Sequence, residues 1–210
     1  SLKTSSGQAE SKLRAALIMK FLLYSLICST ALAASTTPQK HLVVLVHGLS
    51  GTAADLGYLV RRLEADASVR VLASGANEPF PRTLDGVDAG GARVADEVRQ
   101  VASAYKTISF VGNSLGGLYA RAALRELRDG DTFAGLKPAV FVTTAAPHLG
   151  ARQTQYGPLA PLLRLIPSFV SIARSARDAM LQTSTVADLT CCEALQALAL
   201  FPKRRAYGSA

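Results

Sequence analysis

The sequence has no tryptophan, only three cysteines and few aromatic residues, which make up 6% of the chain. Three cysteines in 210 residues exclude a small domain built on disulfides. The 16 glycines and 9 prolines follow no collagen-like period, and 49% of the residues are hydrophobic, which excludes a disordered chain. The length fits one domain, alone or with a leader.

Basic residues outnumber acidic ones by 23 to 15, which gives a formal net charge of +8. Most of the excess lies in residues 1–40 and in Lys203 to Arg205, whereas residues 41–202 are close to neutral. Basic residues in this middle part alternate with acids, as in Arg125-Glu126, and no basic stripe carries interleaved aromatics. The sequence therefore predicts no nucleic-acid partner.

Residues 1–34 are expected to form a leader. Met19 is the first methionine, and a short basic start is followed by an apolar run from Phe21 to Ala34 that ends in Ala31-Leu32-Ala33. This order is typical of a secretory signal peptide cleaved near Ala33 or Ala34, and the run is shorter than the ~20 residues that span a bilayer. We expect secretion or delivery to an endomembrane lumen. An uncleaved leader that anchors the protein in a membrane is the alternative, and an organelle-targeting stretch is a further one.

Two of the cysteines, Cys191 and Cys192, are adjacent in the chain. A disulfide between neighbours needs strained geometry. We interpret both as small core hydrophobic residues at the edge of a helix. Pairing of either one with a cysteine outside this sequence is the alternative. Cys28 lies within the leader.

From His41 onward, apolar runs alternate with segments of helical periodicity. The patterns predict strands at 42–46, 69–73, 107–111 and 139–143, with a further one beginning at Arg204, and helices at 53–66, 91–104, 116–129 and 188–199. This β-α-β order predicts an α/β fold with a mostly parallel sheet and helices on both faces. Residues 149–185 interrupt this alternation of strands and helices. We interpret them either as a lid or acyl-binding wall over the site or as a plain surface insertion. Ligands of such sheets bind at the carboxyl ends of the strands.

The third predicted strand is followed by Gly112-Asn113-Ser114-Leu115-Gly116. A G-x-S-x-G sequence between a strand and a helix is typical of a nucleophile elbow, because a turn this tight has no room for side chains at either flank. The serine hydroxyl then lies above the sheet, at the positive N-terminus of the next helix. Ser114 is the predicted nucleophile of an acyl-transfer enzyme, with Gly112 and Gly116 as the supporting glycines.

The first strand ends in His47-Gly48-Leu49. Acyl transfer needs two N–H donors directed at the developing oxyanion. We expect one from the backbone of Leu115 and the other from Leu49 or Ser50. His47 is expected to brace this loop rather than to transfer protons.

His148 follows the fourth strand and is a tempting general base. In this architecture, however, the histidine lies beyond the last strand, after the acid. We therefore expect a structural role for His148 beside the site. His41, His47 and His148 lack cysteines or clustered carboxylates around them, so no metal site is expected.

With these motifs the chain resembles the putative serine esterase family, a group of lipase-like α/β-hydrolases that is also catalogued as a domain of unknown function. The resemblance is carried, in order, by HLVVLVHGLSGTAADLGYLVRRL, TLDGVDAGGARVADEV, ISFVGNSLGGLYARAAL and FVTTAAPHLGARQ. The DGVDAGG stretch at residues 85–91 separates this family from hydrolases at large. Asn113 is a departure, since many members have histidine there. The resemblance implies hydrolysis of lipid or other carboxylic esters by Ser114, without a cofactor.

The resemblance also implies that the acid and the histidine of the triad follow the strand that begins near Arg204, after Ala210. After the fourth strand the only acids are Asp178, Asp188 and Glu193, and none of them follows a strand. We therefore expect residues 35–210 to be an α/β-hydrolase domain truncated at its C-terminal end, inactive alone because a serine hydroxyl needs a base.

Two other functions stay open from the sequence. The first is a catalytically silent hydrolase-like module that binds lipid or a protein partner, and the second is hydrolysis of a protein or thioester substrate. The expected partners are an ester or lipid substrate and a membrane surface. The oligomeric state is left open.

Overall fold

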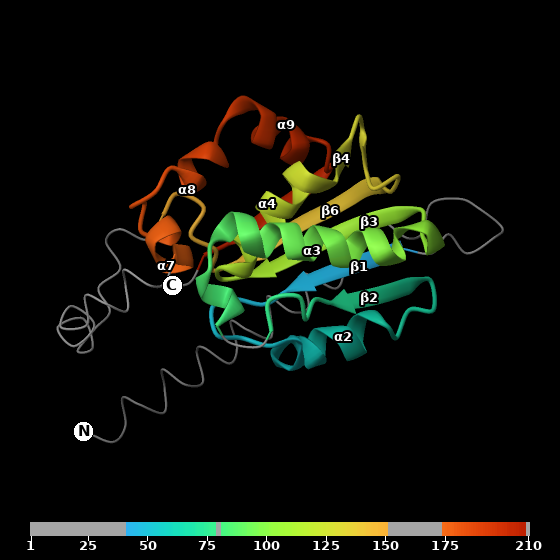
Figure 1. The fold of residues 1–210 in the computed structure, drawn as a ribbon. Coiled ribbons are helices and arrows are strands. Elements are labelled where there is room, and N and C mark those ends of the chain that lie inside the picture. The colour runs from blue at the N-terminus through green and yellow to red at the C-terminus, as the bar shows by residue number, and fades with distance from the viewer. Residues whose placement is uncertain (1–40, 79–80, 151–173, 209–210) are drawn as a thin grey trace, which may run out of the picture.

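The computed structural model describes residues 41–78, 81–150 and 174–208 (Figure 1). The expected leader and most of the excursion at 149–185 lie outside these residues. The strands are β1 (His41–Val46), β2 (Val69–Ala73), β3 (Thr107–Asn113), β4 (Arg128–Asp129), β5 (Thr132–Phe133), β6 (Lys137–Thr144) and β7 (Lys203–Tyr207). The α-helices are α2 (Gly57–Leu63), α3 (Val87–Val101), α4 (Gly116–Leu127), α7 (Arg174–Ala179), α8 (Thr185–Asp188) and α9 (Cys192–Ala199). Short 3-10 turns lie at η1 (Ala53–Leu56), η2 (Arg82–Leu84) and η3 (Ala102–Ala104).

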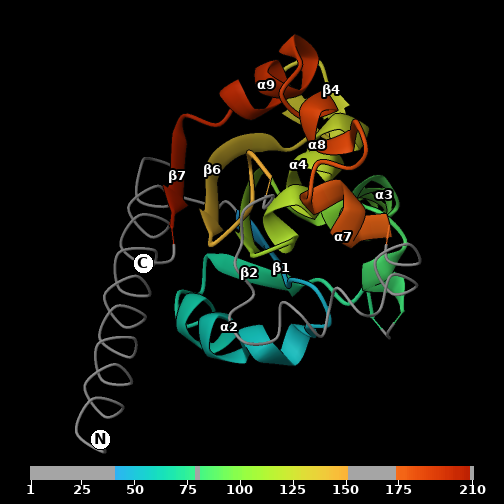
Figure 2. The ribbon, with the colours of Figure 1, turned by 90° about the vertical axis from the view of Figure 1, so that its left-hand side faces the viewer.

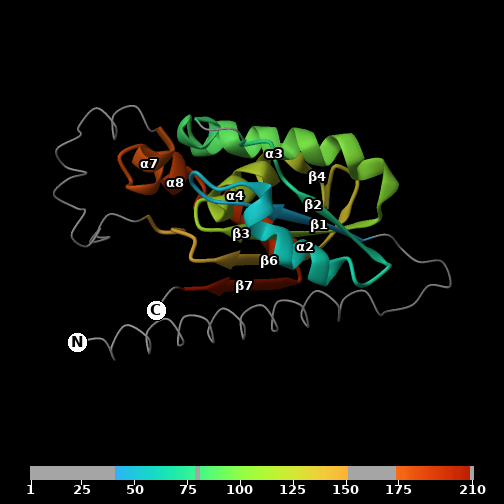
Figure 3. The same ribbon diagram turned by 90° about the horizontal axis from the view of Figure 1, so that it is seen from below.

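Five strands form one parallel sheet in the order β2-β1-β3-β6-β7. The predicted α/β architecture with a mostly parallel sheet is confirmed. The small antiparallel pair β4-β5 was not predicted, because strands of two residues carry no periodicity. Figure 3 shows α7 and α8 beyond the ends toward which β6 and β7 point.

The two faces of the sheet are covered unequally. Helices α3, α4 and α9 bury most of the core on one face, together with the aromatic side chains of the sheet. On the other face α2 covers a smaller cluster of valines and leucines that includes Val43, Leu63 and Val142. Figure 2 shows α2 on the opposite side of the sheet from α3 and α4.

A β-bulge between β3 and β6 determines which residues of the two strands lie opposite each other. Ile108 pairs with Pro138, but the next residue, Ser109, pairs with Val140, so that Ala139 is skipped. The Oγ of buried Ser109 accepts a hydrogen bond of 3.0 Å from the Val140 N–H, which satisfies the ladder at the bulge. As a result Phe141 comes level with Phe110, with ring centroids 6.4 Å apart.

Helix α3 begins at Val87, whereas the sequence indicated a loop up to residue 91. The glycines at 90 and 91 gave the wrong expectation, because in the structure they provide close packing between helices rather than a turn. A Cβ on Gly90 would lie 2.6 Å from the ring of Tyr119 on α4. The N-terminus of α3 is capped from a distance, since Asp178 Oδ2 accepts the Val87 N–H at 2.8 Å.

The helix expected at 188–199 begins only at Cys192, as α9, and the separate short helix α8 already ends at Asp188. Cys191 and Cys192 are both free and exposed, so the expectation that they belong to the core is wrong. The buried side of α9 is formed by Ala194 and Ala197, and the cysteines lie at its exposed start. No helix among the described residues is long and apolar enough to cross a bilayer.

Candidate active site

Ser114 occupies the sharp turn between β3 and α4. Its φ of 53° lies in the left-handed region, which a residue with a Cβ rarely adopts. The Ser114 N–H donates a hydrogen bond of 2.8 Å to the carbonyl oxygen of Thr144, and the Ser114 carbonyl oxygen accepts one of 3.0 Å from Gly117 N–H. Ser114 is half-buried. The turn therefore has the strained geometry that a nucleophile elbow requires.

Glycines make this turn sterically possible. A Cβ on Gly112 would lie 2.5 Å from the Cα of Gly117, and one on Gly116 would overlap the carbonyl oxygen of Val46. A Cβ on Gly48 would lie only 2.9 Å from that of Ser114, so the end of β1 lies directly against the serine. The structure thus brings together Gly48, Gly112, Gly116 and Ser114.

The loop after β1 faces the serine with two exposed residues, Leu49 and Ser50. The Ser50 N–H donates a hydrogen bond of 3.2 Å to Thr83 Oγ1, so it is already engaged. Among the described residues, no acceptor is found for the N–H groups of Leu49 and Leu115. These two amides are the ones open to an oxyanion, and their role in the reaction stays a prediction.

His47 is buried beneath this loop. Its Nδ1 donates a hydrogen bond of 3.0 Å to the Gly48 carbonyl oxygen, which also accepts the Gly51 N–H at 3.1 Å. Its Nε2 lies 3.9 Å from Glu78 Oε1. The same carboxylate oxygen accepts the Ala53 N–H. These contacts fit the expected bracing of the loop.

His148 lies between β6 and α4 and contacts Thr143 and Arg121. Arg121 Nη1 can only donate, so Nδ1 of His148 accepts at 3.4 Å, and its Nε2–H donates to Thr143 Oγ1 at 2.7 Å. Burial, followed by the nearby charge of Arg121, lowers the pKa of His148 to about 4. Both ring nitrogens are occupied, which fits the expected structural role.

A cavity of about 440 Å³ opens beside this histidine, between α4, α9, β6 and β7. Arg121 lines the cavity and is itself buried. Its Nη2 donates a hydrogen bond to the Leu189 carbonyl oxygen, which satisfies part of the buried guanidinium. The cavity is bordered by Arg121, Phe141, Thr143, His148, Leu149, Thr190, Leu195, Leu198, Arg204, Arg205 and Ala206. Its mixed apolar and cationic wall lies beside the site but does not include Ser114.

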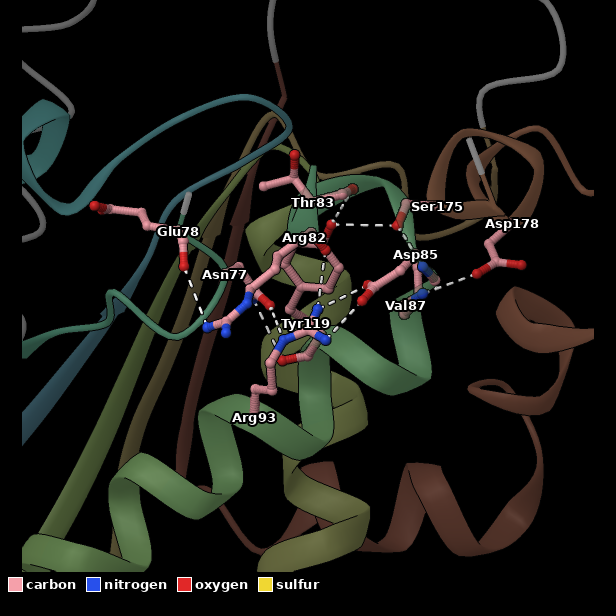
Figure 4. A network of polar contacts seen from close by, with 12 residues as sticks. Asn77, Glu78, Arg82, Thr83, Asp85, Val87, Arg93, Tyr119, Ser175 and Asp178 are labelled. Carbon is pink, nitrogen blue, oxygen red and sulfur yellow. Dashed lines mark hydrogen bonds and ion pairs between the residues drawn. The ribbon is translucent and has the colours of Figure 1, made fainter. Parts of the chain in front are cut away.

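A polar network, which the sequence did not predict, links the site to α3 and α7 (Figure 4). Tyr119 is fully buried on α4, where its hydroxyl donates to the Thr83 carbonyl oxygen at 2.8 Å and lies 3.4 Å from Ser175 Oγ. Asp85 forms a bidentate pair with Arg93, with both distances 2.7 Å. Burial raises the pKa of Tyr119, so its hydroxyl stays protonated. The only sequence clue was the DGVDAGG stretch, which supplies Asp85 and the glycines of the helix contact.

None of the acids considered from the sequence lies at the serine. Asp178 belongs to α7 and is buried against the start of α3, where its Oδ2 accepts the Val87 N–H. Its Oδ1 accepts Thr183 Oγ1–H at 2.5 Å. Asp188 is exposed and bonds Ser184. In residues 41–78, 81–150 and 174–208, no group of three or more His, Cys, Asp and Glu side chains could hold a metal ion.

Comparisons with known proteins agree with this geometry. The chain is 31% identical to "Putative lipase ROG1" of Saccharomyces cerevisiae, over 83% of this chain. It spans only 27% of the length of that yeast protein. Bacillus licheniformis lipase BlEst2 has a similar fold in its propeptide form, with a TM-score of 0.56, 16% identity, and coverage of 82% of this chain and 37% of that one. The mature form of BlEst2 gives a TM-score of 0.51, with 16% identity over 82% of this chain and 67% of that one.

The structural matches establish the α/β-hydrolase fold. The family description Putative serine esterase (DUF676) matches residues 36–210, nearly all of the chain after the expected leader. The chain therefore belongs to this family of lipase-like hydrolases.

Proposed function

We propose that the protein is a serine hydrolase of carboxylic esters that forms an acyl-enzyme at Ser114. The observation that carries the proposal is the left-handed turn at Ser114, closed by glycines and placed against the loop that ends β1. A strained turn of this kind costs stability, and such strain is concentrated at functional sites. The membership of a lipase-like family supports the same chemistry.

In the proposed reaction, Ser114 Oγ attacks the ester carbonyl carbon and its proton passes to a general base. The carbonyl oxygen becomes an oxyanion that accepts hydrogen bonds from the N–H groups of Leu49 and Leu115. The tetrahedral intermediate collapses, and the alcohol leaves with the proton that the base returns. Water, activated by the same base, then hydrolyses the acyl-enzyme and releases the carboxylic acid.

The base and the acid that orients it are proposed to come from outside the described residues. Within these residues, His148 has both nitrogens occupied and His47 bonds Gly48 instead of Ser114. The triad order of nucleophile, acid and histidine is consistent with this assignment. A domain without those two groups would react slowly, because the serine hydroxyl would have no proton acceptor.

The proposed substrate is a lipid or another carboxylic ester. The name of the yeast relative, a putative lipase, favours a lipid, and export through the leader would bring the enzyme to a lumenal or outer membrane surface. Rates of full-length protein on p-nitrophenyl esters of increasing acyl length test this proposal. A preference for long chains supports a lipase, and a preference for the shortest chain contradicts it.

The direct test is labelling of the full-length protein with a fluorophosphonate probe, which reacts with activated serines. We expect labelling of the wild type, loss of labelling in Ser114→Ala, and unchanged labelling in the matched control His148→Gln. An unlabelled but folded wild type would instead favour the catalytically silent lipid- or protein-binding module.

A further inference from the structure

The loop that supplies the Leu49 amide is short, exposed and strained. Leu49 is 43% exposed, and Ser50 has a φ of 54°, again in the left-handed region. A loop with these properties has competing conformations, in which a peptide plane turns over and its N–H points elsewhere. Its catalytic geometry must therefore be imposed by contacts from outside the loop.

The first peptide plane of the loop joins Gly48 to Leu49. Peptide groups are planar and trans, so the Leu49 N–H points away from the Gly48 carbonyl. That carbonyl is held by two donors, His47 Nδ1–H and Gly51 N–H. Together they hold this peptide plane from its carbonyl side, at the end that precedes Leu49.

The second peptide plane joins Leu49 to Ser50. Its N–H is held by Thr83 Oγ1, a hydroxyl that lies 33 residues away in sequence and is only 1% exposed. With both planes fixed, the backbone dihedrals of Leu49 between them are fixed as well.

Thr83 is itself firmly placed. It lies in η2, where its carbonyl oxygen accepts the Tyr119 hydroxyl and the carbonyl oxygen of Arg82 accepts Arg93 Nη2–H at 2.9 Å (Figure 4). Tyr119 belongs to α4, the helix that begins at Gly116, two residues after Ser114. The support of the oxyanion loop and the support of the nucleophile are therefore parts of one packed unit.

We propose that Thr83 is a positioning residue for the oxyanion hole, which holds the Leu49–Ser50 peptide so that the Leu49 N–H faces the substrate. This inference rests on the proposed ester hydrolysis. Thr83 touches no substrate and acts through the loop. Its hydroxyl contributes mainly when charge develops on the carbonyl oxygen, so its loss lowers kcat more than it raises KM.

The test compares Thr83→Val with Thr83→Ser in the full-length protein on p-nitrophenyl butyrate. Valine keeps the volume and removes the hydroxyl, and we expect kcat to fall about 10- to 100-fold with KM changed less than about twofold, somewhat below the loss of a whole oxyanion donor. Serine restores the hydroxyl, and we expect kcat within about threefold of the wild type. Equal kcat for valine and wild type, or no rescue by serine, overturns the proposal.

Ser175→Ala is the matched control, because Ser175 belongs to the same network but bonds Gly86 N–H and Tyr119 instead of Ser50. We expect a lower Tm with kcat unchanged. If Ser175→Ala lowers kcat as much as Thr83→Val does, the effect of Thr83 is general destabilisation and the proposal fails.

Amide hydrogen exchange at Ser50, followed by NMR, separates this proposal from the proposed function. We expect the Ser50 N–H to be protected in the wild type and in Thr83→Ser, and to exchange faster in Thr83→Val. Fast exchange in the wild type overturns the positioning role. Protection in a wild type that hydrolyses no ester shows that the contact exists but that the hydrolase function, and with it the catalytic role of Thr83, is wrong.

Discussion

The turn after β3 and the turn after β6 begin with the same backbone conformation but serve different purposes. Ser114 has a φ of 53° and Ala145 a φ of 52°, and each donates its N–H to the end of the next strand, to Thr144 at 2.8 Å and to Tyr207 at 2.7 Å. After Ser114, glycines lead the chain directly into α4. After Ala145 no helix follows at once, and His148 is bound to neighbouring side chains. A left-handed residue at a strand end is therefore not enough to mark a nucleophile; close-packed glycines and a helix N-terminus must accompany it.

The largest expected effect on stability comes from disturbing the glycine packing in the turn after β3. Gly116→Ala would force a Cβ into the carbonyl oxygen of Val46, and we expect a loss of about 3 kcal/mol, at the upper end of overpacking effects, because backbone atoms cannot move aside easily. Urea unfolding of the variant measures this loss. Gly75→Ala is the matched control, since a Cβ there meets nothing within 4 Å, and it should be neutral or slightly stabilising. A neutral Gly116→Ala would contradict the structure of the turn.

The two turns also differ in how they affect the pH dependence of stability. We expect the turn after β6, which contains His148, to contribute to it, but not the turn after β3. The pKa of His148 is lowered to about 4, and that of buried His41 also to about 4, mainly by burial. Between about pH 6.5 and 4 the unfolded chain binds protons that the folded protein does not, so stability falls as pH decreases through this window. His148→Gln should leave about half of this pH dependence, that of His41, when the free energy of unfolding is measured from pH 7 to 4. An unchanged slope in the variant would show that His148 is protonated easily in the folded protein.

The smallest effect concerns the strain that both turns share. Replacing Ala145 or Ser114 by glycine removes the strain of a left-handed backbone at a residue with a Cβ, which is about 1–2 kcal/mol. Glycine also makes the unfolded chain more flexible, which destabilises the folded protein by about 0.4–1 kcal/mol. We expect each variant to be more stable by about 0.5 kcal/mol in urea unfolding. Only Ser114→Gly should abolish fluorophosphonate labelling. Destabilisation by Ala145→Gly would mean that the turn after β6 is not strained.

The sequence predicted the parts of the fold and site that depend on neighbouring residues. The strands are recognisable because their apolar runs are continuous, and Ser114 because its glycines lie within two positions of it. Thr83 was missed because its bond to Ser50 spans 33 residues and involves a single hydroxyl, which leaves no pattern. The start of α3 was missed for a related reason, since the residue that caps it, Asp178, lies 91 residues away. Contacts of this kind are determined by tertiary packing, which overrides the local preference of glycine to end a helix.

The skipped residue between β3 and β6 has a consequence far from where it lies. Ser109 precedes Ser114 by about 16 Å, at about 3.3 Å per residue of strand. Pairing without a bulge would move every later residue of β6 by one position, so that Phe141 and Val142 would exchange faces and Thr144 would no longer lie opposite Asn113. The carbonyl oxygen that holds the Ser114 amide is thus brought into place by an irregularity near the opposite end of the sheet. An insertion or deletion near Ala139 would therefore displace the nucleophile's support without touching any residue of the active site.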